Sequence, residues 1–574
     1  MKRRITVAGL CLAALLATAA GCGSSSGDGG GGGGGSSATK SPATTGQQKE
    51  HRGGTLTMLW NGAGTSIDTT LDYDSNWQVL TMTSDGLLNY RRVAGPKGSE
   101  LVPDLAEAIP TATDGGKTYA FKVRQGIRYS TGAEVKPSDF TYTMERQFKA
   151  AAPASNFYQG IIGGDACAKK PKRCDLSKGV VADDAASTVT FHLTEPDPDF
   201  LQKLAIPFAY VVPEGTPNKD IGTKPLPATG PYKIERYTPD QQMVFVRNPH
   251  FKEWSREAQP DGYPDKIVMK LGLSLSDAVT QIERGQADWS YDAPPADRLG
   301  EIGDKYKDQF HINQVPQNYH MAINTRVPPF DKVEVRQALN FATDRNAVLQ
   351  LWGGKALGRI SCQVLPFGFP GHQPYCPYTK NPGTEWSAPD MAKAQQLVDQ
   401  SGTKGQKVTI IATPDETTKA IDLYFVSLLR KLGYKASIKT LNSSVQYSFV
   451  QDSRNKAQLS FSYWYPDYTS ASNFMTTVVG CDGFHKASTS SPNLSEYCDP
   501  AIQAKNEQAL KLAQTDQDAA NKLWAQVDKE TTDGAPLVTL FIANRLDFVS
   551  KRIGNFQFNP SVTGSFMIDQ AWVK

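Results

Sequence analysis

Long hydrophobic runs are absent from this chain after its first twenty residues. A helix that crosses a bilayer needs roughly 20 consecutive apolar residues, so the sequence excludes a protein with several membrane spans. Cysteine is scarce, with 8 in 574 residues, which excludes a scaffold built mainly on disulfides. A surplus of one charge is missing too, because 61 Lys and Arg face 58 Asp and Glu, and Lys2, Arg3 and Arg4 account for the difference. Nothing in this balance favours a nucleic-acid-binding protein.

What is present indicates a folded protein of more than one domain. Hydrophobic residues make up 39% of the chain, which is enough for a substantial core. A length of 574 residues exceeds the usual size of a single domain.

The N-terminus is typical of an export signal. Three basic residues precede an apolar stretch over 5–20 and the pair Gly21-Cys22, which predicts a signal peptide over 1–21. Ala19-Ala20-Gly21-Cys22 resembles the bacterial lipoprotein signal, although Ala19 stands where Leu is commoner. The resemblance implies that Cys22 carries a lipid and that the protein is anchored to the outer face of the cytoplasmic membrane. The alternative is an ordinary secretory signal that leaves Cys22 free.

Residues 22–52 are predicted to form a flexible linker. They consist mostly of small polar residues and include seven consecutive glycines over 29–35. Such a stretch has too little apolar surface to repay the entropy of ordering. The string Gly23-Ser24-Ser25-Ser26-Gly27 matches a hydrolase motif, but this segment offers neither the strand nor the helix that the motif needs.

The remaining six body cysteines are expected to be paired, because an exported protein meets an oxidising compartment. They fall into three couples that are close in sequence, and local loops are the simplest interpretation: Cys167 with Cys174, Cys362 with Cys376, and Cys481 with Cys498. The spacings fit no common zinc pattern, so no metal site is predicted.

Alternating strand and helix patterns fill the second half of the chain. Helices are predicted over 391–398 and 421–429 and around Tyr447, and strands over 408–411, 434–438 and 459–463. This alternation predicts a largely parallel sheet. Ligands bind beyond the carboxyl ends of strands in such sheets.

Three separated segments carry a family resemblance. They are DGGKTYAFKVRQGIRYSTG at 114–132 with VKPSDF at 135–140, ATGPYKIERY at 228–237 with VRNPHF at 246–251, and VPPFDKVEVRQALNFATDR at 327–345. In this order they resemble the signatures of the family 5 solute-binding proteins of ABC transporters, the peptide and nickel group. The resemblance covers about 53–574.

The third segment also predicts local structure by itself. Asp331 is expected to cap a helix, with Glu334 completing a capping box. Arg336 and Arg345 are expected to form surface or lobe-lobe salt bridges.

The resemblance implies a two-lobed, periplasmic-binding-protein-like α/β fold (type II, cluster C-like) with an extra subdomain and discontinuous lobes. The lobes would close about a hinge. The implied division is lobe I at 53–86, 213–315 and 545–574, an additional subdomain at 87–212, and lobe II at 316–544.

The implied function is the capture of a peptide-like solute between the lobes and its delivery to an ABC permease. No catalysis, cofactor or nucleic-acid partner is expected. The protein is expected to be a monomer. Two alternatives remain: a nickel chelate or another small polar solute as cargo, and a secreted, lipid-anchored hydrolase.

The candidate site follows the predicted strand at 459–463. Trp464, Tyr465 and Asp467 offer aromatic walls and a carboxylate, which suit a ligand with a flat part and a cation. In peptide-binding relatives a Trp and an Asp of this segment line the pocket, and the Asp takes the peptide amino terminus. The alternatives are a core Trp and a turn-forming Asp. Relatives often continue with a second Asp and a Pro, whereas this chain has TSASN at 469–473.

Residues in other parts of the chain are also predicted to line the binding site. Thr55 to Trp60 is predicted to form the first strand. Trp60 and Asn61 stand at its end, and Gly62 permits close backbone approach there. Tyr319 precedes the predicted strand HMAINT at 320–325 and Asn324 lies near its end, and both are expected at the floor of the cleft. The chain contains no H-E-x-x-H motif, and its closest body histidines, His311 and His320, lie on predicted strands.

Overall fold

The structure is a computed structural model that describes residues 50–62, 66–72, 76–561 and 564–574. The predicted signal peptide over 1–21, the predicted lipidation site Cys22 and the linker up to residue 49 lie outside the described residues. Within the described ranges, no helix is long and apolar enough to span a membrane.

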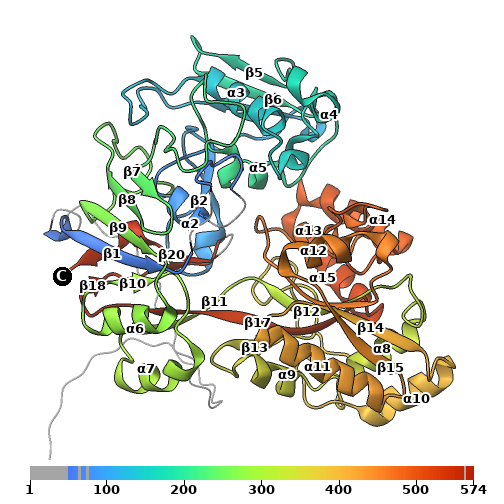
Figure 1. Cartoon of the computed structure of the whole chain (residues 1–574). Coiled ribbons are helices and arrows are strands. Elements are labelled where there is room, and N and C mark those ends of the chain that lie inside the picture. The colour runs from blue at the N-terminus through green and yellow to red at the C-terminus, as the bar shows by residue number, and fades with distance from the viewer. Residues whose placement is uncertain (1–49, 63–65, 73–75, 562–563) are drawn as a thin grey trace, which may run out of the picture. The chain divides into compact units, whose positions relative to one another are not determined.

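A five-stranded sheet with the order β10-β1-β9-β8-β7 is built from the first part of the chain (Figure 1). Its strands are β1 (Thr55–Trp60), β7 (Tyr232–Thr238), β8 (Gln242–Arg247), β9 (Lys266–Leu271) and β10 (Trp289–Ser290). β1 pairs parallel with β9 and β10, and Leu56 and Met58 of β1 are fully buried. Helices α6 (Leu275–Glu283) and α7 (Leu299–Lys305) pack beside this sheet, in one apolar cluster with Leu59 of β1.

The C-terminal end of the chain returns to this region. Val549 bridges to Trp289 of β10, and the last short strands follow. These are β18 (Ile553–Gly554), β19 (Phe558–Asn559), β20 (Ser565–Phe566) and β21 (Trp572–Val573), with β18 pairing β21 and β19 pairing β20.

A three-stranded antiparallel sheet with the order β4-β6-β5 lies in the stretch between β1 and β7. The elements of this stretch are α2 (Trp77–Leu80), β2 (Leu88–Tyr90), β3 (Leu101–Pro103), β4 (Thr118–Lys122), α3 (Pro137–Lys149), α4 (Gly164–Lys169), β5 (Val180–Asp183), β6 (Thr188–His192) and α5 (Phe200–Lys203). Phe121 and Phe191 of this sheet belong to the same apolar cluster as Leu56 of the five-stranded sheet. The two sheets therefore share one hydrophobic core.

One buried ion pair connects α3 to Asp68, which lies between β1 and α2 along the chain. Arg146 donates from Nη1 and Nη2 to the two carboxylate oxygens of Asp68 at 2.8 and 2.5 Å, and both side chains are fully buried. Its Nε also donates to the carbonyl oxygen of Pro217 at 2.9 Å. The guanidinium thus has partners along its whole fork, which is the condition for a buried charge to be tolerated.

A seven-stranded sheet occupies most of the second half, with the order β11-β17-β12-β16-β14-β15 and β13 pairing β17. Its strands are β11 (Phe310–Gln314), β12 (Asn318–Ile323), β13 (Gly358–Ile360), β14 (Lys407–Ala412), β15 (Lys435–Thr440), β16 (Leu459–Trp464) and β17 (Leu537–Phe548). The predicted strands at 408–411, 434–438 and 459–463 are confirmed to within two residues at each end.

The expectation of a largely parallel sheet is wrong for this sheet. β14 is parallel to β15 and β16, but β12 and β17 pair antiparallel with their neighbours. Along the chain, β12 precedes the alternating helices and strands from β14 to β16, and β17 follows them. These two strands enter the sheet in opposite directions.

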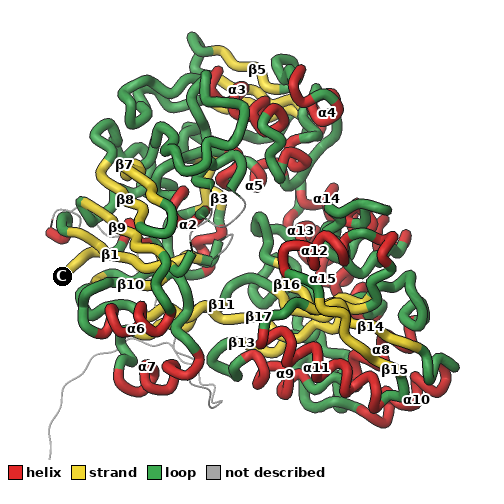
Figure 2. Tube along the Cα trace, viewed as in Figure 1, coloured by secondary structure: helices red, strands yellow, loops and turns green. Residues whose placement is uncertain are grey.

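Helices cover both faces of the seven-stranded sheet (Figures 1 and 2). One apolar cluster contains residues of α8 (Val333–Ala342), α9 (Arg345–Trp352), α10 (Met391–Ser401) and α11 (Glu416–Lys431). Another contains residues of α12 (Ser443–Gln451), α13 (Ser472–Met475), α14 (Pro500–Ala513) and α15 (Gln517–Asp533). Ile410 and Ile411 of β14 belong to different clusters, as expected for alternating side chains of one strand.

Two expectations about the segment 327–345 are wrong. Helix α8 begins at Val333 after Lys332, so Asp331 does not cap it. Arg345 is fully buried, and it donates to carbonyl oxygens, including that of Thr539 in β17 at 2.8 Å, instead of forming a surface salt bridge. Arg336 is also buried and donates to the carbonyl oxygen of Gly534. Both arginines therefore fasten helices to their neighbours.

The three suggested cysteine couples are joined in the structure. Cys167–Cys174, Cys362–Cys376 and Cys481–Cys498 are disulfide-bonded, with Cα atoms 4.3 to 5.0 Å apart. Each bridge closes a local loop.

We expect the Arg146→Met variant to be destabilised by about 3 to 5 kcal/mol, because it leaves the Asp68 carboxylate buried without its cation. Urea unfolding followed by fluorescence measures this change. Lys305→Met is the control, since its partner Glu301 and Lys305 itself lie at the surface, and it should leave the midpoint almost unchanged. Equal midpoints for the two variants would contradict the structural role of Arg146.

Candidate functional site

A cavity of about 860 Å³ lies at the carboxyl ends of β14 and β16. Ile411, Ala412 and Thr413 line it from the end of β14, and residues 461–465 line it from β16 and the turn after it. Helices α11 and α12 and the loops at 153–157 and 477–492 supply further lining residues, and Tyr319, Trp352 and Asp467 complete the lining. Since β14 and β16 are parallel, both carboxyl ends open at the same edge, which is where the sequence predicts a ligand.

Four of the predicted site residues line this cavity and three do not. Trp464, Tyr465, Asp467 and Tyr319 belong to the lining. Trp60, Asn61 and Asn324 lie outside it. The ring of Trp60 packs on Tyr291 with centroids 4.3 Å apart, the backbone N–H of Asn61 donates to Asp292, and the amide of Asn324 donates to Glu496 at 2.8 Å.

Asn473 holds the two central predicted residues together. Its Oδ1 accepts from the indole Nε1 of Trp464 at 2.8 Å and from the backbone N–H of Asp467 at 3.2 Å. Its Nδ2 donates to Oδ2 of Asp467 at 3.1 Å. Asn473 and Asp467 are buried and Trp464 is half-buried, and these hydrogen bonds fix the orientations of the indole and the carboxylate beside the cavity.

The segment 469–473, in which this chain departs from many relatives, has a clear structural role. The hydroxyl of Ser472 donates to Asp199, and the backbone N–H of Thr469 donates to the phenol oxygen of Tyr90 at 3.3 Å. The neighbouring Tyr468 is buried, with its ring centroid 6.1 Å from that of Phe157. These contacts dock the turn after β16 onto the stretch that contains β2, α5 and the loop at 153–157.

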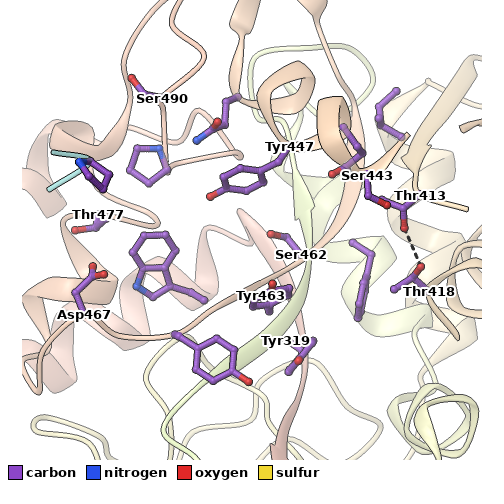
Figure 3. Close-up of a pocket in the computed structure, with 18 of the residues that line it drawn as sticks. Tyr319, Thr413, Thr418, Ser443, Tyr447, Ser462, Tyr463, Asp467, Thr477 and Ser490 are labelled. Carbon is purple, nitrogen blue, oxygen red and sulfur yellow. Dashed lines mark hydrogen bonds between the residues drawn. The ribbon is translucent and has the colours of Figure 1, made fainter. Parts of the chain in front are cut away.

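Aromatic side chains form the middle of the cavity (Figure 3). Tyr463 and Tyr447 are 52% and 44% exposed, although such rings are usually buried. Tyr319 packs against Tyr463 and Trp352, with ring centroids 5.2 and 4.8 Å apart. Sequence reasoning missed Tyr447 and Trp352, which come from helices away from the run FSYWY at 461–465, and it assigned Tyr463 to the strand at 459–463 instead of to the site.

Asp422 on α11 is a further lining residue that the sequence reasoning did not single out. It is 1% exposed, and its Oδ1 has no hydrogen-bond partner in the described part of the chain. Burial raises the pKa of the Asp422 carboxyl from 3.8 to about 7. A signal was present, because this Asp interrupts the apolar face formed by Ile421, Phe425 and their neighbours on the helix.

Within the part of the chain that the structure describes, no three His, Cys, Asp or Glu side chains gather as a metal site would require. The one lining histidine, His485, has its Nδ1 at 2.9 Å from the carbonyl oxygen of Ser490.

The Asp422→Asn variant should lose a pH dependence of stability. The folded pKa of about 7 lies above the unfolded value near 3.8, so the folded protein binds more protons between these values and loses stability as pH rises. We expect the variant to gain about 2 to 3 kcal/mol over the wild type between pH 5 and pH 8. Unfolding curves at both pH values test this, and parallel pH profiles would exclude the assigned ionisation.

The Asn473→Ala variant should lose stability. The substitution removes one hydrogen-bond partner from the half-buried Trp464 indole N–H and one from the Asp467 carboxylate, at a cost of about 1 to 3 kcal/mol in unfolding free energy. Urea unfolding followed by fluorescence measures this change. An unchanged unfolding midpoint would mean that these hydrogen bonds do not stabilise the turn after β16.

Comparison with known proteins places the chain in a family. Residues 100–486 match the family described as bacterial extracellular solute-binding proteins, family 5 Middle. The chain is 26% identical over 509 residues to a protein of Pseudomonas aeruginosa named di/tripeptide-binding protein 1, covering 82% of this chain and 86% of that protein. It is 24% identical to the periplasmic oligopeptide-binding protein OppA of Salmonella typhimurium, covering 80% and 81%.

Solved structures agree on the fold. The clavulanic acid biosynthesis oligopeptide binding protein 2 superposes with a TM-score of 0.81 at 23% identity, covering 91% of this chain and 96% of that one. DppA from Helicobacter pylori in complex with the peptide STSA gives a TM-score of 0.71 at 19% identity, covering 92% and 100%. The fold is therefore the two-lobed, periplasmic-binding-protein-like α/β fold that the sequence predicted. The chain belongs to the family 5 bacterial extracellular solute-binding proteins, which are binding proteins and not enzymes.

Proposed function

We propose that this protein is the substrate-binding component of an ABC importer, which captures a peptide-type solute in the cavity at β14 and β16 and delivers it intact to a membrane permease. The names of the relatives support peptides as the class of cargo. The observation that carries the proposal is the Asp467 carboxylate, fixed by Asn473 beside the Trp464 indole at the cavity wall.

Asp467 would bind the α-ammonium group of the peptide. A carboxylate in a largely desolvated position attracts a cation more strongly than one in water, and the neighbouring indole offers a flat apolar wall. Tyr465 and Tyr319 would contact the peptide backbone or its first side chains. Trp60 and Asn61 remain proposed contacts from the other lobe, which would reach the ligand on closure.

The proposed lobes follow the division 53–86, 213–315 and 545–574 for lobe I, 87–212 for the additional subdomain and 316–544 for lobe II. Separate apolar clusters for the five-stranded and the seven-stranded sheets support two bodies. β11 and β17 pair antiparallel, and they lie where the chain would pass from one proposed lobe to the other. Closure about these strands would remove the ligand from water before the complex meets the permease.

Export and membrane attachment belong to the same proposal. Cleavage before Cys22 and lipidation of its side chain would leave the folded body on a linker of about 30 residues, with an r.m.s. span on the order of 30 Å. This is enough for a monomer to reach a permease in the same membrane.

Isothermal titration of Asp467→Asn with alanine tripeptides tests the proposed role. We expect binding of the free-amine peptide to weaken about 10- to 100-fold, because the ammonium loses its counter-charge in a desolvated site. The N-acetylated peptide should bind both proteins equally weakly. The control is Asp297→Asn, an exposed carboxylate on the short helix before α7. Unchanged affinity of Asp467→Asn for the free-amine peptide would remove this residue from the site.

A further inference from the structure

The cavity has a carboxylate at each of two separate positions along its length. Figure 3 shows Asp467 on one side and the pair Thr413 and Thr418 on the other, with Tyr463 and Tyr447 between them. The hydroxyls of Thr413 and Thr418 are 3.1 Å apart. Asp422 lies one helical turn after Thr418 on α11, so it belongs to the threonine end of the cavity.

No lysine or arginine accompanies these carboxylates in the cavity lining formed by the described residues. The lining contains Asp422, Asp467 and His485 as its ionisable groups besides tyrosines. Arg545 is close enough to Tyr465 to influence it electrostatically, but its guanidinium already donates to Asp547 at 3.0 Å and to the carbonyl oxygen of Tyr291. The lining is therefore acidic and offers no ready partner for a ligand carboxylate.

Among the described residues, Asp422 has no partner that explains its burial. Its Oδ1 makes no hydrogen bond to them, and burial is the sole cause of its altered ionisation, with no described cation nearby to compensate. A buried polar atom without a partner is costly, and native proteins keep few of them outside functional sites. A partner supplied by the ligand would remove this cost.

We propose that Asp422 is a second cation subsite, which binds an ammonium or guanidinium group of a ligand whose other end is held at Asp467. The proposal rests on the proposed function for the α-ammonium at Asp467 and adds the substrate class, a peptide with a basic side chain. Tyr447 and Tyr463 lie between the two subsites, where they can cover the apolar stem of a lysine or arginine and face its charge. Thr413 and Thr418 offer hydroxyl oxygens to the remaining N–H groups.

The test compares lysine peptides with matched peptides that lack only the side-chain charge. Ala-Lys-Ala and Ala-Ala-Lys are titrated against their Nε-acetyl-lysine counterparts, using wild type, Asp422→Asn and the control Asp399→Asn. Asp399 is an exposed carboxylate at the end of α10, so its substitution changes the net charge equally. We expect the wild type and the control to prefer at least one lysine peptide by about tenfold or more. In Asp422→Asn this preference should fall below about threefold.

A proton count provides a second measurement that needs no variant. At pH 6 the buried carboxyl of Asp422 is protonated in the empty protein, so pairing with a cation should release about one proton. Heats of binding in two buffers of different ionisation enthalpy report this proton. The lysine peptide should release it, and the acetyl-lysine peptide should not.

The outcomes separate this proposal from the proposed function. A preference for lysine that survives in Asp422→Asn, its absence from the wild type, or equal proton release by both peptides overturns the second subsite and leaves peptide binding intact. If no peptide binds, the proposed function fails. Titration with spermidine in place of the peptide then tests the cation subsite by itself. Spermidine binding that is lost in Asp422→Asn supports the subsite, whereas its absence or its persistence in the variant overturns it.

Discussion

The parallel pairing of β14 with β16 is the constraint on which the candidate site depends. It brings the carboxyl ends of two strands, separated by α11, β15 and α12 along the chain, to one edge of the seven-stranded sheet. Thr413 and Trp464 are thereby placed on the same cavity, and α11 and α12 deliver Asp422 and Tyr447 to it. A register or direction change in this pair would separate the two carboxylates, since side chains of a shifted strand change faces.

The sequence predicted the parts of this arrangement that are local and left out those that depend on tertiary packing. β16 and the turn with Trp464 and Asp467 were predictable, because a strand pattern and a turn pattern follow each other directly. Tyr447 and Asp422 enter the cavity from helices. The apolar face of α11 marks Asp422 as an unusual buried carboxyl, but the cavity that either residue faces depends on how its helix crosses the sheet, which no local pattern encodes. Arg345 was misassigned for the same reason, because one of its carbonyl partners, that of Thr539 in β17, lies almost two hundred residues away.

Electrostatics distinguish this cavity from a generic apolar pocket. Aromatic rings line its middle, and a low local dielectric around a buried carboxylate strengthens its attraction to a ligand cation as much as it penalises an unpaired charge. Asp467 accepts a hydrogen bond from Asn473, whereas Asp422 retains a proton to near neutral pH because it is buried. The two carboxyls therefore differ in the empty protein, since a hydrogen bond orients the first and burial keeps the second neutral.

The turn after β16 links the ligand site to the rest of the molecule. Asp467 is followed directly by Tyr468, whose ring packs near Phe157 and under the Lys203 ammonium, 5.9 Å from the ring centroid. Phe157 also lines the cavity, and Ser472 donates to the buried Asp199 next to α5. A displacement of the 87–212 stretch relative to the seven-stranded sheet must therefore move or break contacts within a few residues of Asp467. The geometry of the candidate site and the packing of the 87–212 stretch against the seven-stranded sheet consequently cannot change independently of each other.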